Sequence, residues 1–155
     1  EAQLDRFSLR IRLGYTPAAV EMDILEKQVS RHPIESLSPV LSTDEITGLQ
    51  QAVRQVHVSP AIRDYVVRIV SRTREHDDIL LGSSPRGSLA MMRGAQALAL
   101  IEGKTFASPH HVKRVAGSVL SHRLILTPQA RLSGLTAETI LEDILNTVEV
   151  PTEQK

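Results

Sequence analysis

Apolar and polar side chains alternate over residues 7–13, and this period of two is typical of a half-buried β-strand. The apolar positions are Phe7, Leu9, Ile11 and Leu13. A single strand cannot satisfy its own backbone hydrogen bonds, so it needs a sheet. The pattern therefore predicts an orphan strand, whose sheet belongs to a segment that precedes Glu1 in a longer protein.

After Gly14 the apolar residues recur at helical spacing, and serine or threonine stands directly before proline at several helix starts. This pair is favourable because the first residue caps the helix and proline fits its first turn. The pairs are Thr16-Pro17, Ser59-Pro60, Ser84-Pro85, Ser108-Pro109 and Thr127-Pro128. Helices are predicted over 17–29, 43–55 and 85–102, and also after Ser59, Ser108 and Thr136. The predicted fold is mainly α, a helical bundle preceded by one β-strand.

The predicted helix over 85–102 is apolar nearly all round, which is typical of a helix at the centre of a bundle. Only 3% of the residues are aromatic, which favours a helical core of aliphatic side chains. The chain has no cysteine, so disulfides, thiolate zinc sites and cysteine nucleophiles are excluded. Its six histidines show no convincing metal-ligand spacing, and we interpret them as structural or surface residues.

The sequence has no apolar run of the length that a membrane helix needs, and its first residues lack the pattern of a signal peptide. We therefore expect a cytoplasmic protein without membrane insertion.

The net charge is zero, yet residues 83–137 carry seven Lys and Arg against one Glu, a net charge of +6. Residues 138–155 carry −4. The basic segment could face phosphates or nucleic acid, or pair with the acidic tail. Because the whole chain is neutral, we do not expect nucleic acid as a partner.

Arg86 is the first candidate site residue, within Gly82-Ser83-Ser84-Pro85-Arg86-Gly87. Ser84 and Pro85 place Arg86 in the first turn of a helix, where a cation is locally unfavourable because of the helix dipole. An anion held by both the arginine and the free backbone N–H groups would justify this position. The alternative is an arginine that only faces solvent at a helix start.

Arg6 is the second candidate, in Leu4-Asp5-Arg6-Phe7. An arginine suits the charge that develops on a transferring phosphoryl group, because its planar fork binds two oxygens. A surface ion pair with Asp5 or Glu1 is the alternative.

Two segments partly resemble a Walker A loop, which binds phosphates. The glycines at 82 and 87 have its spacing but lack its lysine. Gly103-Lys104-Thr105 has its ending, but it follows a helix where a Walker A loop should follow a strand. Neither segment is expected to bind ATP by itself.

These motifs together resemble those of the MoxR-type AAA+ ATPases. The segment 1–7, Glu-Ala-Gln-Leu-Asp-Arg-Phe, is similar to the box that follows sensor 1 in that family. Leu13-Gly14-Tyr15-Thr16-Pro17 looks like the end of the last core strand and the crossing into the lid. Thr73-Arg74 and the segment 81–89 resemble the sensor-2 region, and 97–103 and 119–124 continue the likeness.

The resemblance implies that residues 1–15 end an AAA+ core, that 16–147 form a helical lid domain with sensor 2, and that 148–155 are a tail. Arg6 would be the arginine finger that acts in a neighbouring subunit, and Arg86 the sensor-2 arginine that contacts nucleotide phosphates of its own subunit. Tyr15 would lie near the adenine. The family implies ATP and Mg²⁺ as ligands of the full-length protein, with no tight binding by this fragment.

The resemblance further implies a ring of subunits, hexameric in our expectation, in which ATP hydrolysis drives chaperone-like remodelling of partner proteins. Von Willebrand factor A-domain proteins are the expected class of partner. No hydrolysis is expected of the chain alone, because it lacks Walker A and Walker B. Two alternatives remain at this point: a stand-alone helical binding module that uses 83–137, and the lid of another AAA+ branch such as magnesium chelatase.

Overall fold

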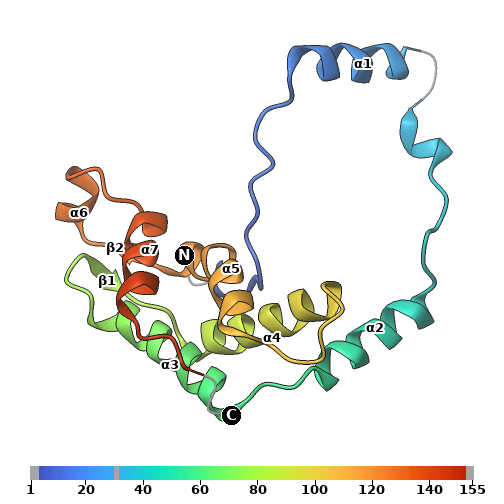
Figure 1. Cartoon of the computed structure of the whole chain (residues 1–155). Helices are drawn as coiled ribbons and strands as arrows, with labels where there is room; N and C mark the ends of the chain where they lie inside the picture. The colour runs from blue at the N-terminus through green and yellow to red at the C-terminus, as the bar shows by residue number, and fades with distance from the viewer. Residues whose placement is uncertain (1–3, 30–31, 153–155) are drawn as a thin grey trace. The chain divides into compact units, whose positions relative to one another are not determined.

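The computed structural model describes residues 4–29 and 32–152, and Figure 1 shows it coloured along the chain. Within that part the structure is mainly helical. The elements, in chain order, are η1 (Leu4–Arg6), α1 (Ala18–Gln28), η2 (Pro33–Ser36), α2 (Thr43–Gln55), α3 (Pro60–Glu75), β1 (Ile79–Leu81), α4 (Pro85–Ile101), α5 (Pro109–Leu120), η3 (Ser121–Arg123), β2 (Ile125–Leu126), α6 (Pro128–Leu132) and α7 (Ala137–Thr147).

Contacts divide the chain into two units, one of residues 11–49 and one of residues 4–10 with 50–152. The first unit holds α1, η2 and the start of α2, and its described side chains are exposed. The second unit holds the remaining helices and both candidate arginines. The domain boundaries that the sequence suggests at residues 15 and 147 remain predictions.

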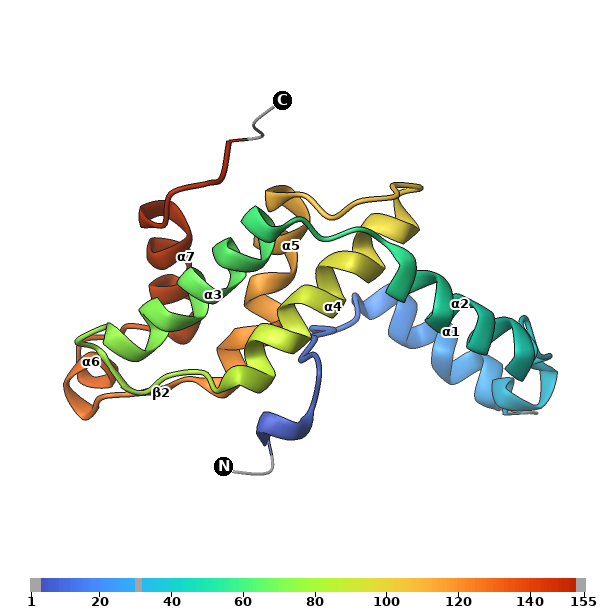
Figure 2. The same cartoon turned by 90° about the horizontal axis from the view of Figure 1, so that it is seen from below.

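The core of the larger unit lies between α3, α4, α5 and α7, where α3 and α5 contact each other and both of the other two helices. Figure 2 shows α3 and α4 side by side, with α5 next to α4. Its largest fully buried side chains include Tyr65, Ile69, Met91, Leu120, Leu141 and Ile144. Burial of each such side chain contributes about 1.5–3 kcal/mol to folding, so this cluster is the main source of stability.

Side-chain caps set several helix starts where the sequence predicts them, but not at Thr16-Pro17, where Pro17 is the N-cap of α1 and no side chain caps the helix. Ser59 Oγ accepts a hydrogen bond from the N–H of Ile62 at 3.3 Å, and Thr127 Oγ1 accepts one from Ala130 at 3.2 Å. Gly103, just after the end of α4, has a positive φ of 68°. Glycine adopts this left-handed conformation without strain and commonly follows the end of a helix. The predicted helices over 17–29, 43–55 and 85–102 are confirmed, with bounds shifted by no more than a residue.

Residues 7–13, where the alternation predicts a strand, form no strand in the structure, and all of them are exposed. The physical reason is that a strand needs a neighbour for its backbone groups, and the described residues supply none along this segment. The N–H of Arg10 instead donates to the carbonyl of Ser118 at 2.9 Å. The sheet that does form is a pair, β1 with β2, antiparallel, with Ile79 opposite Leu126.

Helix α4 is also less enclosed than its sequence suggests. Met91, Ala95 and Ala99 are buried, yet Leu89 is 60% exposed and Ile101 81% exposed. The buried side packs through small residues: a side chain at Gly94 would be in ordinary contact with Val115 of α5. The other side remains open and lines the cavity described below.

Among the described residues, no helix is both long and apolar enough to cross a bilayer.

Candidate functional site

Arg86 lies in the first turn of α4, as the sequence predicts. Ser84 is the N-cap, and its Oγ accepts a hydrogen bond from the N–H of Arg86 at 3.2 Å. Pro85 occupies the first helical position. The Arg86 side chain is 62% exposed, so its guanidinium is available at the positive end of the helix.

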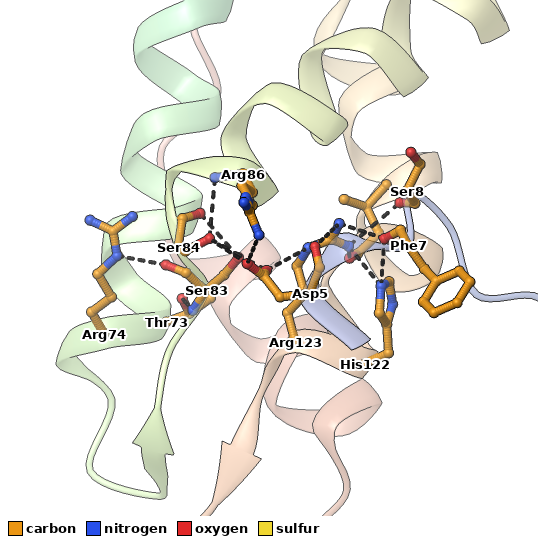
Figure 3. A network of polar contacts seen from close by, with 11 residues as sticks. Asp5, Phe7, Ser8, Thr73, Arg74, Ser83, Ser84, Arg86, His122 and Arg123 are labelled. Carbon is orange, nitrogen blue, oxygen red and sulfur yellow. Dashed lines mark hydrogen bonds and ion pairs between the residues drawn. The ribbon is translucent and has the colours of Figure 1, made fainter. Parts of the chain in front are cut away.

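The turn that carries Arg86 is fixed by the end of α3, as Figure 3 shows. Thr73 is fully buried, and its Oγ1 donates to the carbonyl of Val70 at 2.6 Å and accepts from the N–H of Ser83 at 3.0 Å. Arg74 Nε donates to the carbonyl of Ser83 at 2.7 Å. A Cβ at Gly82 would lie 2.5 Å from the Thr73 carbonyl oxygen, so only glycine allows this approach. The Thr-Arg pair of the sequence motif therefore anchors the sensor-2-like turn.

A cavity of about 640 Å³ opens beside the start of α4. Four arginines contribute to its lining: Arg6, Arg86, Arg93 and Arg123. Its acidic lining residue is Asp5, and the rest of the wall is largely apolar. A cavity with this balance of charge suits an anionic ligand with an apolar part.

Asp5 links the N-terminal segment to α4. Ser84 Oγ donates to Asp5 Oδ2 at 3.0 Å, and Arg86 Nη1 lies 3.8 Å from the same oxygen. The carboxylate of Asp5 thus sits at the N-terminus of α4, where the helix dipole and the Arg86 guanidinium both favour a negative charge.

Arg123 is the residue that the sequence reasoning missed. Its side chain is only 2% exposed, and its Nε lies 3.3 Å from Asp5 Oδ1. Burial lowers the pKa of the Arg123 guanidinium, and Asp5 opposes that shift. The signal available in the sequence was an arginine only three positions after the apolar pair Val119-Leu120, close enough to a buried helix end for its side chain to turn inward.

Arg6 is exposed in η1 and lines the same cavity as Arg86. Within the described part of the chain it forms no hydrogen bond or ion pair, so the Asp5 pair considered from the sequence is not formed; Glu1 lies outside the described residues. Tyr15 belongs to the smaller unit and is fully exposed there. The structure therefore brings Arg6 and Arg86 together, and it leaves the expected role of Tyr15 a prediction.

The buried histidine, His111, makes structural contacts. His111 is buried at the start of α5, where its Nδ1 accepts the N–H of Ser108 at 2.9 Å. Its Nε2 lies 3.0 Å from Glu102, which also pairs with Arg114. Among the described residues, no group of three or more His, Asp or Glu is placed to hold a metal ion.

Comparison with known proteins gives this geometry its context. Residues 71–144 match the family described as the AAA lid domain. This span begins in α3 and ends in α7, and it contains both the turn of Arg86 and the buried Arg123.

Relatives extend the match to nearly the whole chain. YeaC of Bacillus subtilis, an uncharacterized protein, is 41% identical over 99% of this chain and 48% of its own length. The chaperone MoxR1 of Mycobacterium tuberculosis is 34% identical over 97% of this chain and 42% of its own length. A crystal structure of a candidate ATPase from Cytophaga hutchinsonii has a TM-score of 0.87 and 26% identity, and covers 97% of this chain and 48% of its own.

The fold and the match over residues 71–144 define the class: the chain carries an AAA lid domain. Its relatives show that the chain corresponds over nearly its whole length to the lid-bearing C-terminal portion of MoxR-type proteins. The chain spans about half the length of the curated relatives that it matches.

Proposed function

We propose that this chain is the lid-bearing part of an ATPase that binds and hydrolyses ATP, with Arg86 as its contact to the nucleotide phosphates. The observation that carries the proposal is the exposed Arg86 guanidinium at the N-terminus of α4, beside a cavity lined by four arginines. The free N–H groups of the first helical turn and the planar fork of the arginine are both suited to phosphate oxygens.

Asp5 supports this proposal because its own carboxylate, an anionic group, lies at the N-terminus of α4. Its carboxylate accepts from Ser84 and lies 3.8 Å from Arg86 Nη1. A phosphate that binds Arg86 would compete with this carboxylate for the same positive end of the helix. We propose that the Mg²⁺ of the nucleotide site is held by residues of the full ATPase that lie outside this chain.

For Arg6 we propose the role of an arginine finger that completes the site of a neighbouring subunit in a ring. Its exposure and its lack of a described partner leave the guanidinium available for such a contact. An arginine supplied by a neighbour would make hydrolysis depend on assembly. From the resemblance to MoxR-type ATPases we further propose that the subunits form a hexameric ring. This ring would remodel partner proteins, with von Willebrand factor A-domain proteins among them.

A stand-alone binding module that uses residues 83–137 finds less support. Of the basic residues in that segment, Arg123 is turned inward and Arg114 pairs with Glu102. The segment therefore presents fewer free cations than its net charge suggests. Steep salt dependence of binding to duplex DNA would favour the module.

The proposal is tested by turnover of the full ATPase that carries this chain, with Arg86→Ala against Arg63→Ala. Loss of a charge-assisted contact to phosphate is expected to lower kcat/KM by about tenfold to a hundredfold. Arg63 is exposed on α3 and lies outside the cavity lining, so its variant is the matched control. Near-normal turnover of Arg86→Ala would contradict the proposal, as would ATP hydrolysis by the isolated chain that survives this substitution.

A further inference from the structure

Arg123 is bound mainly to a segment that lies far from it in the sequence. Its Nη2 donates to the carbonyl of Phe7 at 2.6 Å and to that of Asp5 at 3.3 Å, and its Nη1 lies 3.5 Å from the carbonyl of Ser8. Within its own part of the chain it donates to the carbonyl of Val119. Figure 3 shows the guanidinium between η3 and residues 5–8.

These contacts go beyond what a structural arginine in the lid requires. Three backbone carbonyls and one carboxylate of residues 5–8 converge on a single guanidinium whose side chain is 2% exposed. A buried arginine fork can hold several carbonyls in one fixed geometry, which a flexible ammonium cannot. His122 adds to the contact, because its Nε2 lies 3.1 Å from the carbonyl of Phe7.

The same segment is tied to the start of α4 through Asp5. The Asp5 carboxylate accepts from Ser84 and faces Arg86, so it joins the segment to the N-cap of that helix. Arg6 lies between Asp5 and Phe7, both of which contact Arg123. The backbone on each side of Arg6 is therefore held by one residue of the lid.

We propose that Arg123 is a positioning residue for Arg6: together with Asp5 it latches residues 5–8 to the lid and so fixes where the Arg6 guanidinium points. The inference rests on the proposed function of Arg6 as an arginine finger. The latch also couples Arg6 to Arg86, since Asp5 contacts both Arg123 and the N-cap of α4. A change at the start of α4 would then alter the position of the finger.

The latch itself is tested in this chain by amide hydrogen exchange. The N–H of Arg10 donates to the carbonyl of Ser118 at 2.9 Å, and its protection reports whether the segment stays docked. Arg123→Lys keeps the charge and loses the fork, and Asp5→Asn keeps the shape and loses the charge. Each is expected to raise the exchange rate at Arg10 by about tenfold or more, while amides of α5 keep their protection. Arg63→Lys is the matched control.

Unchanged protection of Arg10 in Asp5→Asn would overturn the latch. Asp5 lies outside the hydrophobic core, so this variant decides the matter even if Arg123→Lys loosens the whole lid. If Arg123→Lys does loosen the whole lid, the amides of α5 lose protection together with the amide of Arg10 in that variant. The amides of α5 keep their protection in Asp5→Asn.

The positioning role is tested by turnover of the full ATPase in a double-mutant cycle. Arg123→Lys is expected to lower kcat by about tenfold and to leave KM near its normal value, because Arg86 still binds the nucleotide. If Arg123 acts through Arg6, adding Arg123→Lys to Arg6→Ala causes no further loss. A further loss of the same size in the double variant would overturn the inference. Normal turnover of Arg6→Ala would refute the proposed finger instead, while the exchange result would still report on the latch.

Discussion

At the scale of single residues, the arginines of the cavity differ by their surroundings rather than by their sequence context. Arg86 and Arg123 both line the cavity, yet one is 62% exposed at a helix start and the other is 2% exposed among carbonyls. Burial removes water from a charged group, so it is tolerated only with several acceptors in place. Arg86 is therefore available for an external anion, and Arg123 is already committed to the chain itself.

Tyr65 offers a test of the core at this scale. Its side chain is fully buried in α3, and its hydroxyl has no hydrogen-bond partner among the described residues. An unpaired buried hydroxyl costs free energy, so Tyr65→Phe is expected to leave the free energy of unfolding unchanged or to raise it by about 1 kcal/mol. Urea titration of both proteins measures this, with Tyr15→Phe as the exposed control. A loss of stability would show that the hydroxyl has a partner.

Glu102 provides a second residue-scale prediction, through pH. The hydrogen bond from His111 holds the pKa of the Glu102 carboxyl below its ordinary value, and Arg114 adds to this. A lowered pKa in the folded state means that the ionised form stabilises the fold above the ordinary pKa and that this stability is lost as the pH falls below about 4.3.

Glu102→Gln is therefore expected to flatten the acid side of the stability curve, measured as the melting temperature between neutral pH and pH 3. Glu142→Gln, an exposed position on α7, serves as the control. An acid limb as steep in Glu102→Gln as in the parent chain would show that other groups dominate.

At the scale of elements, the helix starts follow from local chemistry and the short strands do not. Ser59, Ser84 and Thr136 cap helices where the sequence predicts them. Strands β1 and β2 contain three and two residues, too few for an alternating pattern to be read. The opposite failure occurs at residues 7–13, where the alternation is clear but the described chain provides no partner strand.

The turn before α4 supplies the prediction at this scale. A Cβ at Gly82 would lie 2.5 Å from the Thr73 carbonyl and 2.7 Å from the Arg74 Cα, both backbone atoms that cannot move aside. Gly82→Ala is expected to lower the free energy of unfolding by about 2–3 kcal/mol.

Gly117→Ala is the matched control, because nothing lies within 4 Å of its added Cβ in α5. Alanine favours the helix there, and the expected change is a gain of about 0.5–1 kcal/mol. Thermal unfolding of the two variants measures the difference. Equal stability of the two would contradict the close packing of the turn against α3.

At the scale of the whole molecule, the candidate site combines residues that the sequence identifies singly with a contact that it does not reveal. Arg6 and Arg86 stand out through the residue types around them. The common cavity joins Arg6 to Arg86, which lies 80 positions further along the chain. The contact of Arg123 with Phe7 joins positions 116 residues apart, and no local pattern encodes either pairing. The division of the chain into two units has no clear signal in the sequence either.

We propose that one chain serves two nucleotide sites, its own through Arg86 and a neighbour's through Arg6. The most direct test is ATP turnover of rings assembled from equal amounts of Arg6→Ala and Arg86→Ala subunits. Either variant alone damages every site. In mixed rings, a nucleotide on an Arg6→Ala subunit can receive Arg6 from an Arg86→Ala neighbour, so random mixing should restore about a quarter of the sites. If both arginines act in the same subunit, as their shared cavity would also allow, no site holds both, and unrestored turnover would contradict the claim.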